Sequence, residues 1–585
     1  MQLYHDSQST DCRTPIGPVP CDTQVKLRLY GAPRSSVVLL HLSMNDRDRL
    51  IPMLKGKNDC HEVVWTAPER PSVCFYYFSV LTRDGQTTWY GNAEDGLGCI
   101  GQVCSKKPEP FQITVYSPAY RTPDYLHKGV MYQIFPDRFY RTSIPETAKQ
   151  DAYVHPNWSD EPLVRVDSAV GDPYCMDFFG GTLKGITDKL DYLQELGVTV
   201  LYLNPIFMAR SNHRYDTADY DSIDPMLGSL QDFQELCSQA RARGIRVLLD
   251  GVFSHTGDDS LYFNKYGHWD SLGACQSTQS DYYPWYKFSK YPTEYASWWG
   301  FKTLPELDKN NPDYQNFIYG EDGITRKWLR RGASGWRLDV ADELSMPFLK
   351  GLRAAVKAEK ADAALLGEVW EDASHKVSYG QMRCYCDGET LDSVMNYPLR
   401  RACIDFLLRK INALQLCRVI RSQQENYAPP FYYSLMNLMG SHDRARIFSV
   451  LGEVLQRDDE RIEGMQPELD EKGLALAKGR FLTFLKILVC LPGIPCIYYG
   501  DEVQMQGSAD PYCRGTFPWG KEDAIFLNEV KSLLSNRQNP LFCTGHMVVW
   551  SEGEDTLVIR RFIEDGKDVF GDAAPNGDQT IRITR

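Results

Sequence analysis

Eight apolar runs separated by helical or loop sequence constrain this 585-residue chain more than any other feature. The first three are GVMYQIFPDRF (129–139), GVTVLYLNPIF (197–207) and GIRVLLDGVFSH (244–255), with amphipathic helical patterns around 183–196 and 229–243 between them. Buried strands that alternate with helices predict a parallel (β/α)8 TIM barrel. The other five runs are GASGWRLDVA (332–341), AALLGEVW (363–370), LDSVMNYPL (391–399), SLMNLMGSHD (434–443) and GIPCIYYGDE (493–502).

The sequence on either side of the barrel follows a different pattern. Residues 1–122 carry short alternating runs such as KLRLY and FQITVY between Gly, Pro, Asp and Asn clusters, which predicts an antiparallel β-sandwich. The barrel takes residues 123–537, and its third strand is followed by an interval too long for a simple connection. We therefore expect a small subdomain inserted at about 256–310. Residues 538–585 again have strand patterns and predict a short C-terminal β domain, so the fold class is multidomain α/β.

Charge and composition argue against several classes of partner. A formal net charge of −13 argues against nucleic acid and against an anionic membrane surface. The longest apolar stretch, 481–500, is interrupted by a lysine, two prolines and a glycine, so it predicts a core helix and a buried strand rather than a membrane span. Seventeen scattered cysteines and no visible export signal predict reduced thiols and a cytoplasmic location.

Three acidic residues stand in distinctive strings at the ends of predicted strands: Asp339 in GWRLDVADE, Glu368 in GEVW and Asp443 in GSHDRAR. An unpaired carboxylate is costly in such a buried place, and the active sites of parallel barrels lie at the carboxyl ends of the strands. Breaking a glycosidic bond requires a pair of carboxylates. The three acids therefore predict a glycosidase site. Arg337 shares a strand face with Asp339 and should keep it ionised.

These strings resemble the alpha-amylase family of glycoside hydrolases, family thirteen, and within it the neopullulanase, cyclomaltodextrinase and maltogenic amylase group. The resemblance covers nearly the whole chain, and the N-terminal part resembles the starch-binding-type module of that group. Ten strings occur in the family's order: YQIFPDRF, FFGGTLKGITDKLDYL, SNHRYDTADYDSIDP, DGVFSH, WWGFKTLPELD, GWRLDVADE, GEVW, MNYPLR, GSHD and IPCIYYGDE.

The resemblance also implies roles for particular residues. It implies that Asp339 is the nucleophile, that Glu368 is the general acid and base, and that Asp443 binds the sugar's hydroxyls as the ring distorts. The purely structural alternatives are an Arg–Asp ion pair and histidines that pack in the core. Trp299 and Trp370 are as consistent with core packing as with the lining of a cleft. The residues expected to bind substrate or support the site are Arg337, His255, His442, Tyr215, Asp250 and Arg446.

The implied activity is a retaining hydrolase that cleaves alpha-1,4-glucosidic bonds in maltodextrins, starch, cyclodextrins or pullulan by double displacement. The first alternative is a transglycosylating amylase of the same family, in which a sugar hydroxyl replaces water. The second is an inactive glucan-binding relative. The presence of all three acids argues against it. In the resembled group the N-terminal domain often pairs two copies, which implies a homodimer.

Three departures from the family's strings bear on metal and substrate. Ser254 replaces the Asn before the histidine of the third strand, and Thr182 replaces the Asp of the GGD string, each at a usual calcium position. The segment after DRF, YRTSIPETAK, lacks the Asn, Asp and Gly cluster of a calcium loop. We therefore expect no cofactor and no calcium at either of these two positions. Asp342 replaces the Asn of the VANE string on the acceptor side, which leaves substrate preference open.

Overall fold

The protein's structure, a computed structural model, describes residues 2–44, 47–144, 149–165 and 175–585. At its centre is an eight-stranded sheet in the order β25-β22-β21-β18-β15-β12-β27-β26, with parallel pairing throughout. A bridge from Met395, next to β25, to Met436 in β26 closes the sheet into a barrel. The predicted runs contain its strands: β12 (Val130–Ile134), β15 (Val198–Leu203), β18 (Arg246–Gly251), β21 (Gly335–Leu338), β22 (Ala364–Gly367), β25 (Ser393–Val394), β26 (Met436–Leu438) and β27 (Ile494–Tyr498).

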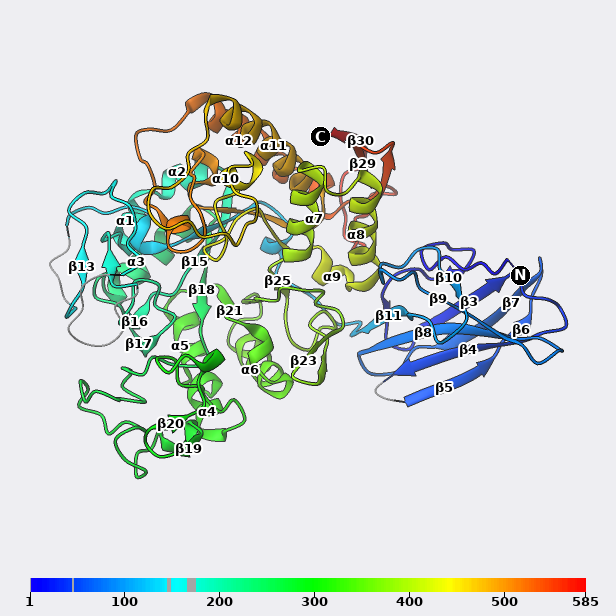
Figure 1. Cartoon of the computed structure of the whole chain (residues 1–585), viewed down its shortest axis with the longest axis horizontal. Helices are drawn as coiled ribbons and strands as arrows, with labels where there is room; N and C mark the ends of the chain where they lie inside the picture. Colours follow the sequence, from blue (N-terminus) through cyan, green and yellow to red (C-terminus); the bar gives the residue numbers. More distant parts are fainter. Residues whose placement is uncertain (1, 45–46, 145–148, 166–174) are drawn as a thin grey trace.

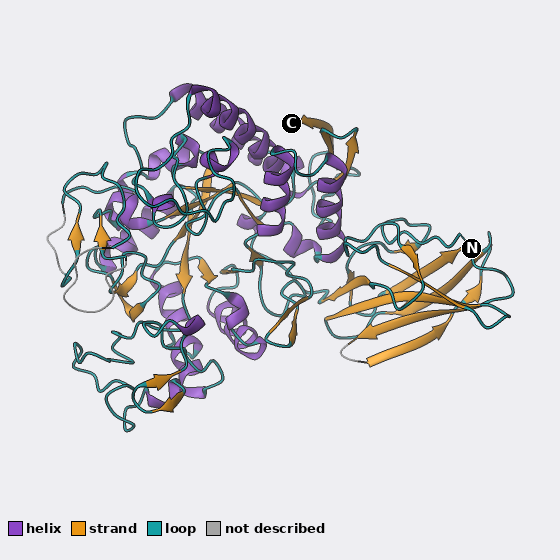
Figure 2. Ribbon diagram, viewed as in Figure 1, coloured by secondary structure: helices purple, strands orange, loops and turns teal. Residues whose placement is uncertain are grey.

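The barrel interior is filled by buried side chains from several strands of the ring. Met131, Val200, Leu248, Leu366 and Met436 belong to one buried cluster inside the ring. The helices pack outside the strands (Figure 2). They are α1 (Leu183–Asp188), α2 (Leu190–Glu195), α3 (Leu230–Ala242), α4 (Pro312–Tyr319), α5 (Ile324–Arg331), α6 (Met346–Glu359), α7 (Tyr397–Leu407), α8 (Ala413–Asn426), α9 (Pro429–Tyr432), α10 (Ile447–Leu451), α11 (Glu471–Cys490), α12 (Ala524–Ser535) and α13 (Pro540–Thr544).

Local sequence explains where these helices begin and break. At α3 the hydroxyl of Ser229 accepts from the backbone of Asp232, whose carboxylate accepts in return, so a capping box starts the helix. The single helix expected around 183–196 is instead two short helices, α1 and α2. The backbone leaves the helical region at Lys189 (φ −107°, ψ 9°), where the ammonium lies 4.1 Å from the ring centres of both Tyr140 and Trp519. Tertiary contacts outweigh helix propensity there.

The sequence between β18 and α4 holds the small β19 (Phe288–Lys290) and β20 (Glu294–Tyr295) hairpin. Its core is aromatic, with the ring of Phe263 4.7 Å from that of Tyr295 and 4.9 Å from that of Tyr286. The backbone N–H of Leu307 donates to Ser254 (3.0 Å), which ties the hairpin region to the end of β18.

The N-terminal region consists of strands, at one end of the molecule in Figure 1. One sheet has the order β1-β3-β7-β6, and a second joins β10-β9-β8-β11-β2 with β4 and β5. Alternate residues of β3, including Val25, Leu27 and Leu29, are buried between the sheets, which explains the alternation in the sequence. The strands are β1 (Arg13–Thr14), β2 (Val19–Pro20), β3 (Gln24–Tyr30), β4 (Val37–Met44), β5 (Arg47–Pro52), β6 (Leu54–Lys55), β7 (Cys60–Thr66), β8 (Ser72–Leu81), β9 (Thr87–Gly91), β10 (Gln102–Cys104) and β11 (Phe111–Tyr116).

A buried ion pair joins this region to the barrel. The guanidinium of Arg13 in β1 lies 3.2 Å from the carboxylate of Glu425 in α8, and both side chains are at least nine-tenths buried. The C-terminal sheet of β28 (His546–Glu552), β29 (Thr556–Ile563) and β30 (Gly577–Thr584) packs on the same helix. Helix α8 is therefore the element against which both flanking β regions dock.

Among the described residues no helix is both long enough and apolar enough to cross a membrane. Four small strand pairs complete the structure outside the larger sheets. Two of them, β13 (Tyr153–Val154) with β14 (Asp177–Phe178) and β16 (Phe207–Ala209) with β17 (Thr217–Ile223), lie in loops between barrel strands. A third, β23 (Lys376–Ser378) with β24 (Gln381–Arg383), follows the fifth barrel strand.

Candidate active site

Asp339 and Glu368 each follow directly on the last residue of a barrel strand. The register pairs Leu338 of β21 with Gly367 of β22, so the next residue of each strand comes to the same height. Backbone bonds extend the pairing, because the N–H of Glu368 donates to Leu338 and that of Asp339 donates to Gly251, both at 3.0 Å. The strand register thus places the two carboxylates side by side.

One guanidinium, that of Arg337, contacts three carboxylates. Its strand position is paired with Asp250 of β18, and Nη1 donates to Asp250 (2.7 Å) and to Asp339 (2.9 Å). Nη2 lies 2.9 Å from Oε2 of Glu368. The Arg337 side chain is only 1% exposed, so these charges interact with little screening by water.

The charge balance of this group favours a proton that is retained on a carboxyl. Burial raises the pKa of both Asp339 and Glu368, Arg337 lowers it, and neighbouring carboxylates raise it again. Because one positive charge faces three carboxylates, they cannot all ionise without a large cost. Asp339 and Glu368 therefore titrate as a coupled pair, with one proton held above the usual carboxyl range.

The carboxylate of Glu368 is fixed by two further donors. The backbone N–H of Val340 donates to Oε2 (2.8 Å), and the indole of Trp370 donates to Oε1 (3.2 Å). Val340 has a left-handed backbone (φ 37°, ψ 68°), which is strained for a β-branched residue. This conformation aims its N–H at Glu368. Trp370 in turn stacks on Tyr397, with 4.0 Å between ring centres.

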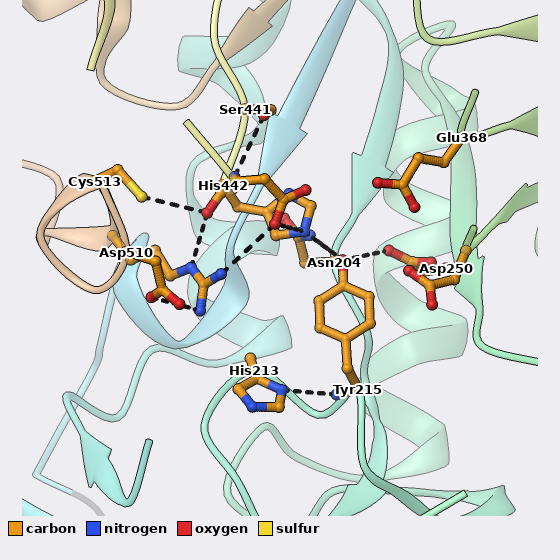
Figure 3. A network of polar contacts seen from close by, with 12 residues as sticks. Asn204, His213, Tyr215, Asp250, Glu368, Ser441, His442, Asp510 and Cys513 are labelled. Carbon is orange, nitrogen blue, oxygen red and sulfur yellow. Dashed lines mark hydrogen bonds and ion pairs between the residues drawn. The ribbon is translucent and has the colours of Figure 1, made fainter. Parts of the chain in front are cut away.

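Tyr215 and His442 connect Asp250 to Asp443, as Figure 3 shows for Tyr215, His442 and Asp250. The Tyr215 hydroxyl donates to Asp250 (3.0 Å) and lies 2.5 Å from Nε2 of His442. The amide of Gln133 donates to Nδ1 of His442 (2.8 Å), which leaves the imidazole proton on Nε2. That nitrogen is 3.3 Å from Asp443, and burial lowers the pKa of His442 far below its usual value. Because the Tyr215 hydroxyl gives its own proton to Asp250, its oxygen accepts the Nε2 proton, so His442 is a neutral donor to Tyr215 that lies beside Asp443.

Asp443 differs from the other two acids in exposure. Its side chain is 28% exposed, against 8% for Asp339 and 6% for Glu368. Besides His442, its nearest charged partner is Arg514, at 3.7 Å, whose Nε also donates to the backbone carbonyl of His442. The structure therefore places Asp443 at the open side of the cluster.

Two of the predicted site residues have partners that lie away from the acids. His255 uses both ring nitrogens within the protein, Nε2 toward the carbonyl of Tyr215 (3.1 Å) and Nδ1 toward Ser254 (2.9 Å). Burial lowers its pKa to about 3, so it is neutral. Arg446 is fully buried beside β27, where it donates to the carbonyl of Tyr499 and to Asp501. The structure does not bring Arg446 to the three acids.

Sequence reasoning did not single out several residues of this cluster. Trp370 was left open between cleft and core, and its position two residues after Glu368 was the signal that could have identified it. Gln133 stands on the first strand with its side chain directed at His442. Arg514 lies in the loop after the eighth strand, where no motif marks it.

The Asp342 substitution in the string after Asp339 forms part of a buried contact. Its carboxylate accepts from the hydroxyl of Tyr385 (2.6 Å) and pairs with Lys376 of β23. The next residue, Glu343, accepts from the indole of Trp299 (3.3 Å) and from the hydroxyl of Tyr379. Trp299 is 74% exposed and Tyr379 is 68% exposed, so two open rings meet at Glu343.

The residues at the family's two usual calcium positions do not fit that ion. The hydroxyl of Ser254 is bonded to His255, and that of Thr182 caps α1 by accepting from Gly185 (2.9 Å). Both oxygens are engaged, and neither is a carboxylate or carbonyl of the kind calcium prefers. Residues 145–148 of the segment after DRF lie outside the described residues.

The barrel is closed and parallel, and its carboxylates lie at the carboxyl ends of the strands. This is where barrel enzymes carry their active sites, so the fold and the site define a barrel protein of that class. Residues 133–569 match the family described as "Alpha amylase, catalytic domain". The chain belongs to the alpha-amylase family.

Individual relatives agree with this assignment. An amylopullulanase of Thermoanaerobacterium thermosulfurigenes is 37% identical over the whole chain, which covers 33% of that relative. Neopullulanase 2 of Thermoactinomyces vulgaris is 34% identical over 77% of this chain and 68% of that relative. The structure of a cyclic alpha-maltosyl-(1→6)-maltose hydrolase from Arthrobacter globiformis matches with a TM-score of 0.64 and 28% identity, over 79% of this chain and all of that one. The chain spans between a third and a half of the length of the amylopullulanases it matches.

Replacing Arg337 with Gln tests the charge balance of the cluster. The change leaves buried carboxylates without their cation, and we expect a loss of about 3–5 kcal/mol in the free energy of unfolding near neutral pH. Without Arg337 the carboxyl pKa values of the folded state rise further above those of the unfolded chain. The folded variant then binds more protons, so stability is lost as pH rises and recovers as pH falls through the raised values. Urea unfolding midpoints measured across pH would show this.

The matched control is Arg457→Gln, which removes an arginine whose side chain is 74% exposed and pairs with Asp459. A surface pair of this kind contributes less than about 1 kcal/mol. If Arg337→Gln lowers the urea unfolding midpoint by the same amount at acidic and at neutral pH, the proposed charge balance is contradicted.

Proposed function

We propose that the protein is a retaining alpha-glucan hydrolase that cleaves alpha-1,4-glucosidic bonds. The observation that carries the proposal is the contact of Asp339 and Glu368 with two nitrogens of the same guanidinium. Two carboxyls that contact the same guanidinium lie close together, which suits the carboxyl spacing of retaining enzymes, about 5–5.5 Å. An inverting enzyme needs a wider spacing, because water must fit between its carboxyls.

In the first proposed step, an oxygen of Asp339 attacks the anomeric carbon while the bond to the leaving sugar breaks. Glu368 gives its proton to the leaving oxygen, and a glycosyl ester on Asp339 remains. Arg337 lies 2.9 Å from both Asp339 and Glu368, so it stabilises the ionised form of either carboxyl. Burial raises the pKa of both carboxyls, which supports one retained proton, and that proton is assigned to Glu368 at the start of the cycle from the roles that the resemblance implies.

In the second step, the Glu368 carboxylate takes a proton from water as the water oxygen attacks the anomeric carbon. The ester bond breaks, and Asp339 returns to its carboxylate form. The Val340 N–H and the Trp370 indole remain on Glu368 in both steps, so the side chain keeps its aim while its charge changes. They act as positioning groups.

Asp443, His442 and Tyr215 are proposed to hold the sugar that reacts. Asp443 is the most exposed of the acids and would accept from sugar hydroxyls as the ring flattens. The neutral His442 lies on the same side, and a bond from its N–H to substrate would require exchange of its present bond to the Tyr215 hydroxyl. The Tyr215 ring lies parallel to the imidazole, with 5.4 Å between ring centres. For His255, a bond to substrate would require exchange of its present bond to the Tyr215 carbonyl.

The substrate class is inferred from the relatives' names. They include neopullulanase, cyclomaltodextrinase, intracellular maltogenic amylase and amylopullulanase. We propose maltodextrins, starch, cyclodextrins or pullulan as substrates, with no nucleic acid or membrane partner. All seventeen cysteines are free thiols, which supports the predicted cytoplasmic location, as does the relative named as intracellular.

A second candidate activity is transglycosylation, in which a sugar hydroxyl replaces water in the second step. The exposed rings of Trp299 and Tyr379 at Glu343 favour it, because they offer an apolar surface beside the loop that follows Asp339. An acceptor sugar held on these rings would compete with water. An inactive glucan-binding relative is disfavoured by the complete set of Asp339, Glu368 and Asp443.

Replacing Asp339 with Asn and, separately, Glu368 with Gln tests the assignment. Asn cannot form the ester, so we expect no measurable turnover of maltodextrin, starch, pullulan or beta-cyclodextrin. Glu368→Gln removes acid and base catalysis, and kcat should fall about 10²–10⁴-fold. Initial rates and chromatographic product analysis measure both, and oligosaccharides longer than the substrate would identify transfer.

The control is Asp95→Asn, which changes an exposed acid paired with Arg418 and should leave the rates unaltered. Binding of maltodextrin by the Asp339→Asn variant, measured by calorimetry, shows whether the site remains formed. Hydrolysis by that variant at the unaltered rate would refute the nucleophile assignment.

We also propose that two copies pair through the N-terminal region. That region exposes apolar side chains on neighbouring strands, with Leu54 of β6 75% exposed and Val64 of β7 52% exposed. Exposed apolar side chains on neighbouring strands offer an area that a second copy would cover. Pairing of copies is common among soluble proteins.

Leu54→Lys tests this pairing. We expect the protein to sediment at twice its chain mass of 66.9 kDa and the Leu54→Lys variant to sediment as single chains. Ile525→Lys is the matched control, because Ile525 in α12 is 78% exposed on the barrel side. Sedimentation of the unaltered protein as a single chain at every concentration would rule the proposal out.

A further inference from the structure

The side chain of Arg141 reaches from the loop after the first barrel strand into a group of backbone carbonyls. Nη1 donates to the carbonyls of His155 (3.0 Å) and Phe179 (3.3 Å), and Nη2 donates to that of Pro156 (2.9 Å). The guanidinium also lies 5.5 Å from the ring centre of Trp158. Two parts of the loop after the first strand, residues 155–158 and Phe179, thus meet on one cation.

Each of these segments is anchored elsewhere. The N–H of His155, just after β13, donates to the carbonyl of Phe178 in β14. The indole of Trp158 donates to the carbonyl of Phe517 (2.8 Å) in the loop after the eighth strand. Phe179 opens the turn that leads to α1, and its own N–H donates to Asp137 (3.0 Å). Arg141 therefore links two parts of the long loop after the first strand, and one of these parts also contacts the loop after the eighth strand.

Converging carbonyl oxygens are the ordinary environment of a bound cation. Calcium takes six to eight oxygen ligands, and backbone carbonyls are frequent among them. A guanidinium offers five N–H donors in a fixed plane, is always charged, and needs no carboxylate if carbonyls surround it. Arg141 stands two residues after the DRF string, where the resembled group often has a calcium loop, and it contacts no carboxylate among the described residues.

The same chain uses a guanidinium in this way at a second, deeper place. Arg537 is fully buried below the barrel, where Nη1 donates to the carbonyl of Phe542 (2.6 Å) and Nη2 donates to those of His127 (2.7 Å) and Gly493 (2.6 Å). Carbonyl groups around an arginine are thus a recurrent device in this protein.

We infer that Arg141 is a built-in cation that takes the structural place of calcium in the loop after the first strand. Thr182 fits this assignment, because its hydroxyl caps α1 instead of supplying a metal ligand. The covalent cation cannot be lost to a chelator, so the order of this loop does not depend on calcium. The inference concerns stability and holds whichever glucan the site cleaves.

The test compares apparent Tm values with calcium and with a chelator. We expect the unaltered protein to melt at the same temperature in both and to hold less than one calcium per chain by elemental analysis. Arg141→Ala should lower Tm by several degrees, because three carbonyls lose a charged donor. Arg141→Lys keeps the charge but lacks the planar fork, so its Tm should fall between the two.

The matched control is Arg121→Ala, since Arg121 also donates to carbonyls, but only to those of Pro118 and Tyr120 in its own segment. Its Tm should not change. The inference is overturned if the unaltered protein binds one calcium tightly and melts earlier with chelator. It is equally overturned if the Tm of Arg141→Ala equals that of the unaltered protein. Both readouts are independent of glucan hydrolysis, so a failure here is distinguishable from a failure of the proposed activity.

Discussion

The site depends on one buried guanidinium, that of Arg337, and on the register that delivers it. Pairing of β18 with β21 sets Asp250 beside Arg337, and pairing of β21 with β22 sets Asp339 beside Glu368. Because the four side chains come from three adjacent strands of a closed barrel, no loop movement is needed to assemble them. The excess of negative charge around one cation keeps a proton in the cluster, which is the condition that acid catalysis by Glu368 requires.

Much of this arrangement could be predicted from the chain. The eight apolar runs identified all eight strands, and acids at strand ends were expected to converge because parallel strands share one carboxyl face. The family strings added roles for His442 and Tyr215, and the structure places both next to the acids. Arg446 was expected to support the site, and it contacts Tyr499 and Asp501 rather than the acids, so its role stays a prediction.

What could not be predicted depends on contacts between distant segments. Nothing in the sequence marks the left-handed backbone of Val340, because β-branched residues avoid that conformation unless the surrounding structure imposes it. The break at Lys189 and the reach of Arg514 to Asp443 also arise from tertiary packing. The substitutions at Asp342 and Thr182 were visible in the sequence, but their partners Lys376 and Gly185 were not.

The account's central claim is that Asp339 and Glu368 act in turn on one anomeric carbon, and the anomeric form of the first product tests it most directly. Two displacements at that carbon retain its configuration, whereas a single displacement by water inverts it. Proton NMR of a maltodextrin digest, recorded before mutarotation, distinguishes the two forms. The account predicts that the new reducing ends appear first as the alpha anomer. Initial appearance of the beta anomer would contradict it.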